Sequence, residues 1–235
     1  MSRISNRKND EARRIEMIPN FLKHAMGSCL ISCGDTKVIC AATIENKVPA
    51  FVKGTGQGWL SAEYSLLPQA TDTRTDREAV KGKQSGRTHE IQRLIGRSLR
   101  ACLDLGVLGE KQIKVDCDVI QADGGTRTAS ICGACVAVGL AIKKLKLRYN
   151  PFVHLVAATS CGVVDGEVLL DLDYSEDSQA EVDSNFVMLD TGNLIEVQAT
   201  GEHGSFDDER LLQLMSYARK NMSQIIEMQK KILLS

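Results

Sequence analysis

A chain of 235 residues is long enough to bury a full hydrophobic core, as one large domain or two small ones. Its 43% hydrophobic and 25% charged residues are ordinary for a soluble globular protein, and no stretch approaches the roughly 18 apolar residues that a membrane span needs. The net charge of −1 excludes a basic field over the whole surface, so any anion site must be a local patch.

The first residues are polar and charged, without the apolar core of a signal sequence, and we expect residues 1–15 to form an arm that is flexible or bound to a partner. Alternating residues in 27–33 and 36–44, around Gly34-Asp35, predict a β-hairpin. Residues 53–58 are rich in glycine. No Lys-Ser/Thr pair closes this stretch, so a tight turn into a strand beginning at Trp59 is favoured over a phosphate-binding loop.

A helix is predicted from Ser85, because Ile91, Leu94 and Ile95 recur at helical spacing. Three arginines lie on another face of this helix: Arg93, Arg97 and Arg100. A solvated face or a subunit contact explains them at least as well as substrate binding does. Arg93 is the best placed for substrate, because it lies nearest the start of the helix.

Residues 112–120 alternate as in a half-buried strand, and Gly124-Gly125 ends it. A helix rich in small residues is predicted from about Thr126, and such a helix can approach its neighbours closely in the centre of the fold. Strands are predicted at 154–163, 167–170, 181–188 and 194–199, followed by a long amphipathic helix from about Asp207. Strand groups followed by long helices predict an α+β fold, with mixed sheets packed against helices in a single domain over residues 1–235.

Most of the eight cysteines lie in apolar, periodic segments, which is typical of buried reduced thiols. Cys132-x-x-Cys135 could be half of a zinc or redox site, but no second Cys or His pair stands at matching spacing, so an ordinary core role is favoured. Reduced thiols indicate a cytoplasmic location.

Two of the predicted helix starts carry residues that suit a bound anion. Each combines glycine, a hydroxyl residue and an arginine: residues 85–88 with Arg87, and residues 124–128 with Gly125, Thr126 and Arg127. The start of a helix offers free backbone N–H groups, glycine permits close approach, and a guanidinium can bind an oxyanion through two donors. The alternative is that Ser85 and Thr126 only cap their helices.

An acidic stretch leads into the strand predicted at 181–188. Asp177 and Asp183 flank the start of this strand and could meet at the edge of a cleft. Such a pair can hold Mg²⁺, or one carboxyl can act as a general acid. A solvated acidic loop is the competing interpretation. Arginine-lined anion sites beside paired carboxylates fit phosphoryl transfer, but these residues do not distinguish hydrolysis from phosphorolysis, or RNA from a nucleotide.

The sequence resembles the RNase PH family of phosphorolytic 3′→5′ exoribonucleases over nearly its whole length. The matching segments are residues 21–24 (FLKH), 27–28, 58–59, 62–64 (AEY), 82–98, 121–130 (QADGGTRTAS), 171–177, 181–183 and 196–198 (EVQ).

The resemblance implies that inorganic phosphate attacks the terminal phosphodiester of RNA, chiefly at tRNA 3′ ends, and releases a nucleoside diphosphate. It implies phosphate binding by Arg87, Gly125, Thr126 and Arg127, and catalysis by Asp177 and Asp183 with Mg²⁺ near them. RNA is expected to contact Arg74, Arg77 and Arg93. The implied assembly is a homohexameric ring, a trimer of dimers.

The family's first arginine in the RNA-guiding loop is replaced here by Gln69, which removes one cationic contact with RNA. Two alternatives keep the fold. The chain could be the catalytic subunit of a hetero-oligomeric, exosome-type ring, or a ring subunit that binds RNA without cleaving it.

Overall fold

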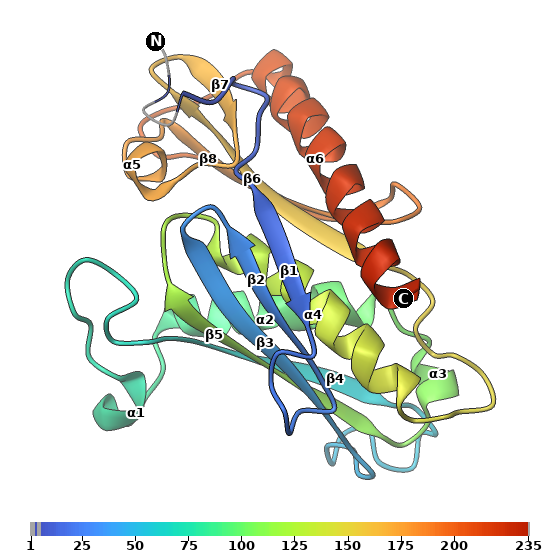
Figure 1. Cartoon of the computed structure of the whole chain (residues 1–235). Helices are drawn as coiled ribbons and strands as arrows, with labels where there is room; N and C mark the ends of the chain where they lie inside the picture. Colours follow the sequence, from blue (N-terminus) through green and yellow to red (C-terminus); the bar gives the residue numbers. More distant parts are fainter. Residues whose placement is uncertain (1–2, 4–5, 235) are drawn as a thin grey trace.

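The computed structural model describes residue 3 and residues 6–234, which form two β-sheets with helices packed between and beside them (Figure 1). The first sheet has five strands in the order β1-β2-β3-β5-β4. Its strands are β1 (Ile15–Pro19), β2 (Gly27–Cys33), β3 (Thr36–Glu45), β4 (Trp59–Leu66) and β5 (Gln112–Gln121). All its pairs are antiparallel except β4 with β5, so this sheet is mixed.

The second sheet is antiparallel, in the order β7-β6-β8-β9. It consists of β6 (Val156–Val164), β7 (Glu167–Leu170), β8 (Val182–Leu189) and β9 (Leu194–Gly201). The short helix α5 (Tyr174–Asp177) connects β7 to β8, and the long helix α6 (Asp208–Leu234) packs along β6, β7 and β8. The α+β prediction is confirmed.

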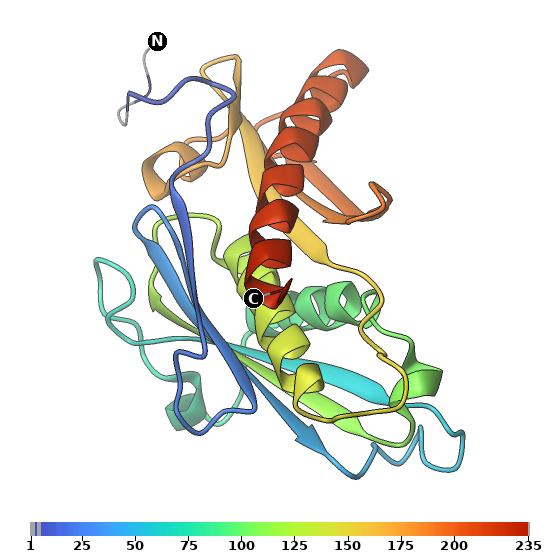
Figure 2. The same cartoon turned by 45° about the vertical axis from the view of Figure 1, so that its right-hand side comes forward.

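Helix α4 (Thr126–Lys143) lies at the centre of the molecule, against β2 and β3 of the first sheet and β6 of the second (Figure 2). Its small residues permit this close packing, as expected: a Cβ on Gly133 would lie only 2.8 Å from Cys40 Sγ. By length and composition α4 is the one described helix that could cross a membrane, but 78% of that stretch is buried inside the protein.

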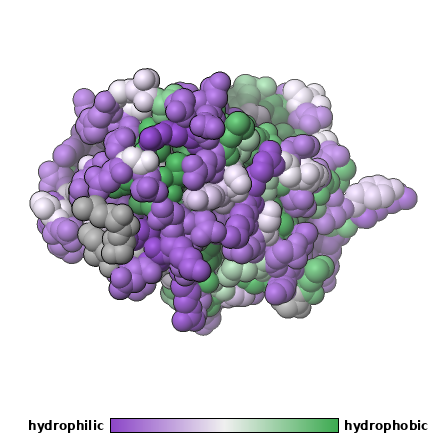
Figure 3. Space-filling view, turned by 90° about the horizontal axis from the view of Figure 1, so that it is seen from above, coloured by the Kyte–Doolittle hydropathy of each residue, from purple (hydrophilic) through white to green (hydrophobic). Residues whose placement is uncertain are grey.

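Three more helices complete the fold: α1 (Glu78–Lys81), α2 (Gly86–Arg100) and α3 (Leu105–Leu108). Helix α2 packs on β4 and α4, burying Ile91, Leu94 and Ile95 as the periodicity predicts. One cluster of buried hydrophobic residues runs from the first sheet through α4 to the second sheet. Seen from above, by contrast, the upper end of the molecule in Figure 1 is predominantly hydrophilic (Figure 3).

The predicted hairpin, the strand at Trp59 and the strand at 112–120 are present as β2–β3, β4 and β5. All eight cysteines are free, and seven are buried, which confirms the core role expected for Cys132 and Cys135. Burial in apolar surroundings raises the pKa of the Cys29 thiol to about 12.

The described part of the N-terminal segment differs from the expected flexible or partner-bound arm. Residue 3 and residues 6–14 pack against the second half of their own chain: β7, the loop before α5, α5 itself and α6. The guanidinium of Arg3 is buried against the carboxylate of Glu176, with nitrogen–oxygen distances of 2.6 and 2.7 Å, and Arg7 also contacts Glu176. Opposite charges more than 160 residues apart make these pairs, and sequence periodicity carries no sign of them.

Candidate active site

A cleft of about 1100 Å³ opens between the two sheets and collects most of the predicted site residues. Arg87 comes from the start of α2, and Gly125, Thr126 and Arg127 come from the start of α4. Asp177, at the end of α5, and Asp183, on β8, line the same cleft. Residues distant in the sequence, from both halves of the chain, therefore face one space.

The start of α2 is fixed by polar contacts that leave Arg87 free to face the cleft. Ser85 Oγ accepts from the backbone N–H of Thr88 at 3.1 Å, so Ser85 is the expected cap. Glu78 accepts from the Thr88 hydroxyl at 2.8 Å and from the N–H of Ser85 at 3.1 Å. Arg87 itself is exposed.

The start of α4 has the backbone geometry of an anion site. Gly124 and Gly125 both adopt positive φ angles, +72° and +66°, which disfavour any side chain. No side chain among the described residues caps the helix, so its first N–H groups remain available for a ligand. Tyr64 Oη lies 2.8 Å from Thr126 Oγ1 and holds that side chain at the helix start.

Gln198 orients Arg127, although the sequence did not predict it as a site residue. Arg127 Nη1 donates to Gln198 Oε1 on β9 at 3.3 Å, while Gln198 Nε2 donates to Glu90 on α2, also at 3.3 Å. Gln198 thus connects Arg127 to the helix that carries Arg87. The one sequence signal for a role of Gln198 is that it lies in residues 196–198, a segment that matches the RNase PH family.

The two aspartates lie where burial disfavours their charge. Burial raises the pKa of Asp183, the negative charge of Asp177 raises it further, and Arg127 opposes both effects. Burial also raises the pKa of Asp177, against the lowering effects of Arg127 and Arg87, although Asp177 keeps an exposed surface toward the cleft. Such a pair suits either a proton donor or a cation site.

The carboxylates of Asp177 and Asp183 fit Mg²⁺, because a divalent cation would offset the cost of burying their charges. The described residues include no cluster of three or more metal-binding side chains. Mg²⁺ usually takes one or two carboxylates and keeps its remaining positions for water and phosphate oxygens, so two protein ligands are sufficient.

The predicted RNA-binding arginines divide into two groups. Arg77 lines the cleft, whereas Arg74 and Arg93 are exposed outside its lining. Arg74 pairs with Asp76 at 3.2 Å. Two further arginines of α2 have structural partners: Arg97 pairs with Glu196, and Arg100 donates to the Leu60 carbonyl at 2.9 Å.

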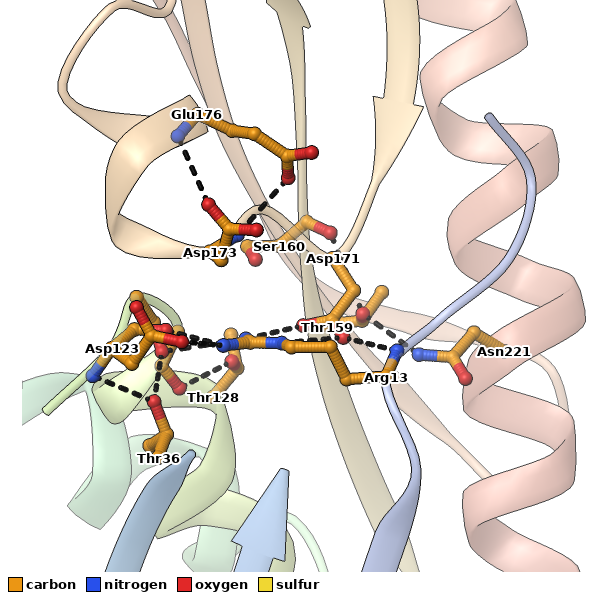
Figure 4. Close-up of polar contacts among 12 residues, drawn as sticks. Arg13, Thr36, Asp123, Thr128, Thr159, Ser160, Asp171, Asp173, Glu176 and Asn221 are labelled. Carbon is orange, nitrogen blue, oxygen red and sulfur yellow. Dashed lines mark hydrogen bonds and ion pairs between the residues drawn. The ribbon is translucent and has the colours of Figure 1, made fainter. Parts of the chain in front are cut away.

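Sequence reasoning also missed Arg13, whose buried guanidinium lies between Asp171 and the turn that precedes α4 (Figure 4). Its Nε and Nη2 donate to the two carboxylate oxygens of Asp171 at 3.0 and 2.7 Å. Ser160 on β6, 4% exposed, also lines the cleft, and its hydroxyl makes no hydrogen bond to the described residues.

Several solved structures are similar to this chain over nearly its full length. Rice (Oryza sativa) Rrp46 is 22% identical, with a TM-score of 0.80 over 98% of this chain and 100% of its own. The Archaeoglobus fulgidus exosome with RNA bound to the active site gives 22% identity and a TM-score of 0.81 over 96% and 92% of the two chains. An archaeal exosome core gives 23% identity and a TM-score of 0.79, over 97% and 91%. At this level of identity the likeness establishes the fold.

Two family models match the chain in succession. The model of the 3′ exoribonuclease family, domain 1, matches residues 11–142, and that of domain 2 matches residues 154–221. The cleft lies where these two matched regions meet. The starts of α2 and α4 belong to the first region, and Asp177 and Asp183 belong to the second. By these matches, the chain belongs to the RNase PH family of phosphorolytic 3′ exoribonucleases.

Proposed function

We propose that this chain is catalytically active and shortens RNA from its 3′ end by phosphorolysis. One observation carries the proposal: Arg87, the start of α4 and the two aspartates face one cleft. A subunit that only binds RNA would have no need of two carboxylates with raised pKa values beside an anion site, because even partial burial of their charge costs stability.

In the proposed reaction, an oxygen of inorganic phosphate attacks the phosphorus of the last phosphodiester. A new phosphorus–oxygen bond forms, the bond to the 3′ oxygen of the preceding nucleotide breaks, and that oxygen takes a proton. The products are a nucleoside 5′-diphosphate and an RNA one nucleotide shorter. Arg87, Arg127 and the N–H groups of Gly125 and Thr126 hold the attacking phosphate.

Asp177 and Asp183 serve the leaving oxygen. A carboxyl whose pKa is raised, as burial does for Asp183, is suited to hold the proton that the 3′ oxygen receives. We propose that the pair also holds Mg²⁺, which when bound would neutralise charge on the phosphate oxygens.

For the assembly we favour a subunit of an exosome-type ring, since the similar structures are exosome proteins matched over almost their whole length. The second candidate is the homohexameric, cytoplasmic enzyme that trims tRNA 3′ ends, which the resemblance of the sequence suggests. Native mass spectrometry of the purified chain separates them. A homohexamer active without other subunits supports the second candidate, and a chain active only with a partner subunit supports the first.

The test of function is incubation of the chain with uniformly labelled RNA and Mg²⁺, with and without inorganic phosphate, followed by separation of the released nucleotides. Nucleoside diphosphates that appear only with phosphate are the expected result. Nucleoside monophosphates formed without phosphate would mean hydrolysis, and RNA binding without release would mean a non-catalytic subunit. Arg127→Ala should remove activity. Arg148→Ala, at an exposed arginine outside the cleft lining, is the matched control and should retain it.

A further inference from the structure

The turn at Asp123-Gly124 is held by two side chains from the N-terminal part of the chain, Arg13 just before β1 and Thr36 on β3. Thr36, at the start of β3, is fully buried, and its hydroxyl donates to the Gly124 carbonyl at 2.6 Å. The same oxygen accepts from the N–H of Asp123 at 2.9 Å. Arg13 donates to the carbonyls of both Asp123 and Gly124 (Figure 4).

These contacts set the direction of the donors that face the cleft. In a planar trans peptide, the carbonyl of one residue and the N–H of the next point in opposite directions. Anchoring the Gly124 carbonyl on Thr36 and Arg13 therefore turns the N–H of Gly125 away from them. Gly125 lines the cleft, and both glycines have the positive φ angles that this turn requires.

Arg13 and Asp123 also contact the acidic loop on the other side of the cleft. Arg13 binds both carboxylate oxygens of Asp171, and Asp123 Oδ1 accepts from the N–H of Tyr174, the first residue of the helix that ends at Asp177. The turn and the acidic loop also touch directly: a Cβ on Gly124 would lie 2.5 Å from the carbonyl oxygen of Leu172.

We propose that Thr36 and Arg13 are positioning residues, which aim the backbone N–H groups at the start of α4 into the cleft and hold that turn against the loop carrying Asp177. They touch neither phosphate nor RNA. The inference rests on the proposed function for its ligand, inorganic phosphate, and adds how the binding geometry is maintained.

The test compares two substitutions of Thr36, one that removes its hydroxyl and one that keeps it. Thr36→Val keeps the shape of the side chain but removes the hydroxyl, and Thr36→Ser keeps the hydroxyl. The control is Gln229→Leu, which removes two buried hydrogen bonds, to the carbonyls of Cys132 and Val156, from a residue outside the cleft lining. For each protein, calorimetry measures the Kd of inorganic phosphate, kinetics give kcat and the KM for phosphate, and thermal unfolding gives Tm.

For Thr36→Val we expect the Kd and KM of phosphate to rise about tenfold, which corresponds to one misdirected buried hydrogen bond, with a smaller change in kcat. Thr36→Ser should stay within about twofold of the wild type, and Gln229→Leu should lower Tm without weakening phosphate binding. A Thr36→Val protein that loses stability but binds phosphate like the wild type would overturn the inference.

A second variant covers the case in which Thr36→Val does not fold. Arg13→Lys keeps the charge, but a single ammonium cannot bind the two carbonyls and Asp171 together, so it should also weaken phosphate binding. Normal phosphate affinity in Arg13→Lys would contradict the inference while leaving the proposed function intact. A wild-type protein that neither binds phosphate nor releases nucleoside diphosphates would overturn the proposed function, and the inference with it.

Discussion

Gln198 Oε1 on β9 lies 3.3 Å from Arg127 Nη1 and connects the second sheet to the start of α4. Because the amide oxygen accepts from the guanidinium, it restricts the orientations that Arg127 can adopt. Gln198→Leu should lower kcat/KM for phosphate about fivefold, as expected from the loss of about 1 kcal/mol of orientation, while RNA binding persists. Gln213→Leu, at an exposed glutamine of α6, is the matched control. An unchanged phosphate KM in Gln198→Leu would mean that Arg127 orients itself without this contact.

Asp183 should show opposite effects on activity and stability. Its pKa is raised in the folded protein, chiefly by burial, so its ionised form destabilises the fold at neutral pH. Asp183→Asn mimics the protonated form. Asp183→Asn should lower activity at least about 100-fold and raise the Tm at pH 7 in the absence of divalent cations.

The stability difference at Asp183 should shrink as the pH falls toward about 4, where the carboxyl of an unfolded chain also binds its proton. Thermal unfolding of both proteins between pH 4 and pH 8 measures this convergence. A wild type more stable than Asp183→Asn at pH 7 without metal would contradict the direction of the pKa shift.

The basic loop before α2 should contribute to RNA affinity through charge alone. Arg77 lines the cleft and Arg74 is exposed beside it in the sequence, so each removed charge should weaken binding of single-stranded RNA. Loss of one phosphate contact should reduce the slope of log affinity against log salt by about 0.7. Filter binding of RNA to Arg74→Ala and Arg77→Ala across a salt series measures this slope. A slope equal to that of Arg148→Ala would exclude the residue concerned from the RNA path.

The cysteines should be unreactive until the protein unfolds. Burial raises the pKa of the Cys29 thiol to about 12 and that of Cys33 also to about 12, so few reactive thiolates exist at pH 8. A disulfide reagent should titrate far fewer than eight thiols in the native protein and all eight in denaturant. Rapid modification of most cysteines in the folded state would contradict the buried positions.

The close contact of α4 with the first sheet should tolerate no extra carbon at Gly133. A Cβ there would meet Cys40 Sγ and Ile31 Cγ2, both at 2.8 Å, so Gly133→Ala should lower the free energy of unfolding by about 1–3 kcal/mol. Gly86→Ala has open space around its Cβ and lies in a helix, so it should be neutral or stabilising. Chemical denaturation measures the free energy of unfolding of the two variants. Equal values would show that the first sheet shifts to accommodate the added carbon.

The local features of the fold could be predicted from the sequence because they depend on neighbouring residues. The cap at Ser85, the start of α4 at Thr126 and the hairpin at Gly34-Asp35 all follow from short patterns. Strand β1 was missed, because five residues ending in proline carry too little alternation to identify a strand.

The contacts that position the site could not be predicted in this way. Arg13 and Asp171 are 158 residues apart, Thr36 and Gly124 are 88 apart, and Arg127 and Gln198 are 71 apart. No periodicity links such pairs, because each forms only when separate elements have packed. The sequence therefore predicted the residues that line the cleft, such as Arg87 and Arg127, but not the distant side chains that contact them.

The separation of 158 residues between Arg13 and Asp171 also determines when this contact can form during synthesis of the protein. Arg13 leaves the ribosome early, but its partner Asp171 and the cleft residues Asp177 and Asp183 follow only after the first sheet and α4 have been made. Closing so long a loop comes late in folding, because non-local contacts must wait for the chain between them. Under the proposed function, a nascent chain should therefore be unable to shorten RNA, including the message that encodes it, until its second sheet has emerged.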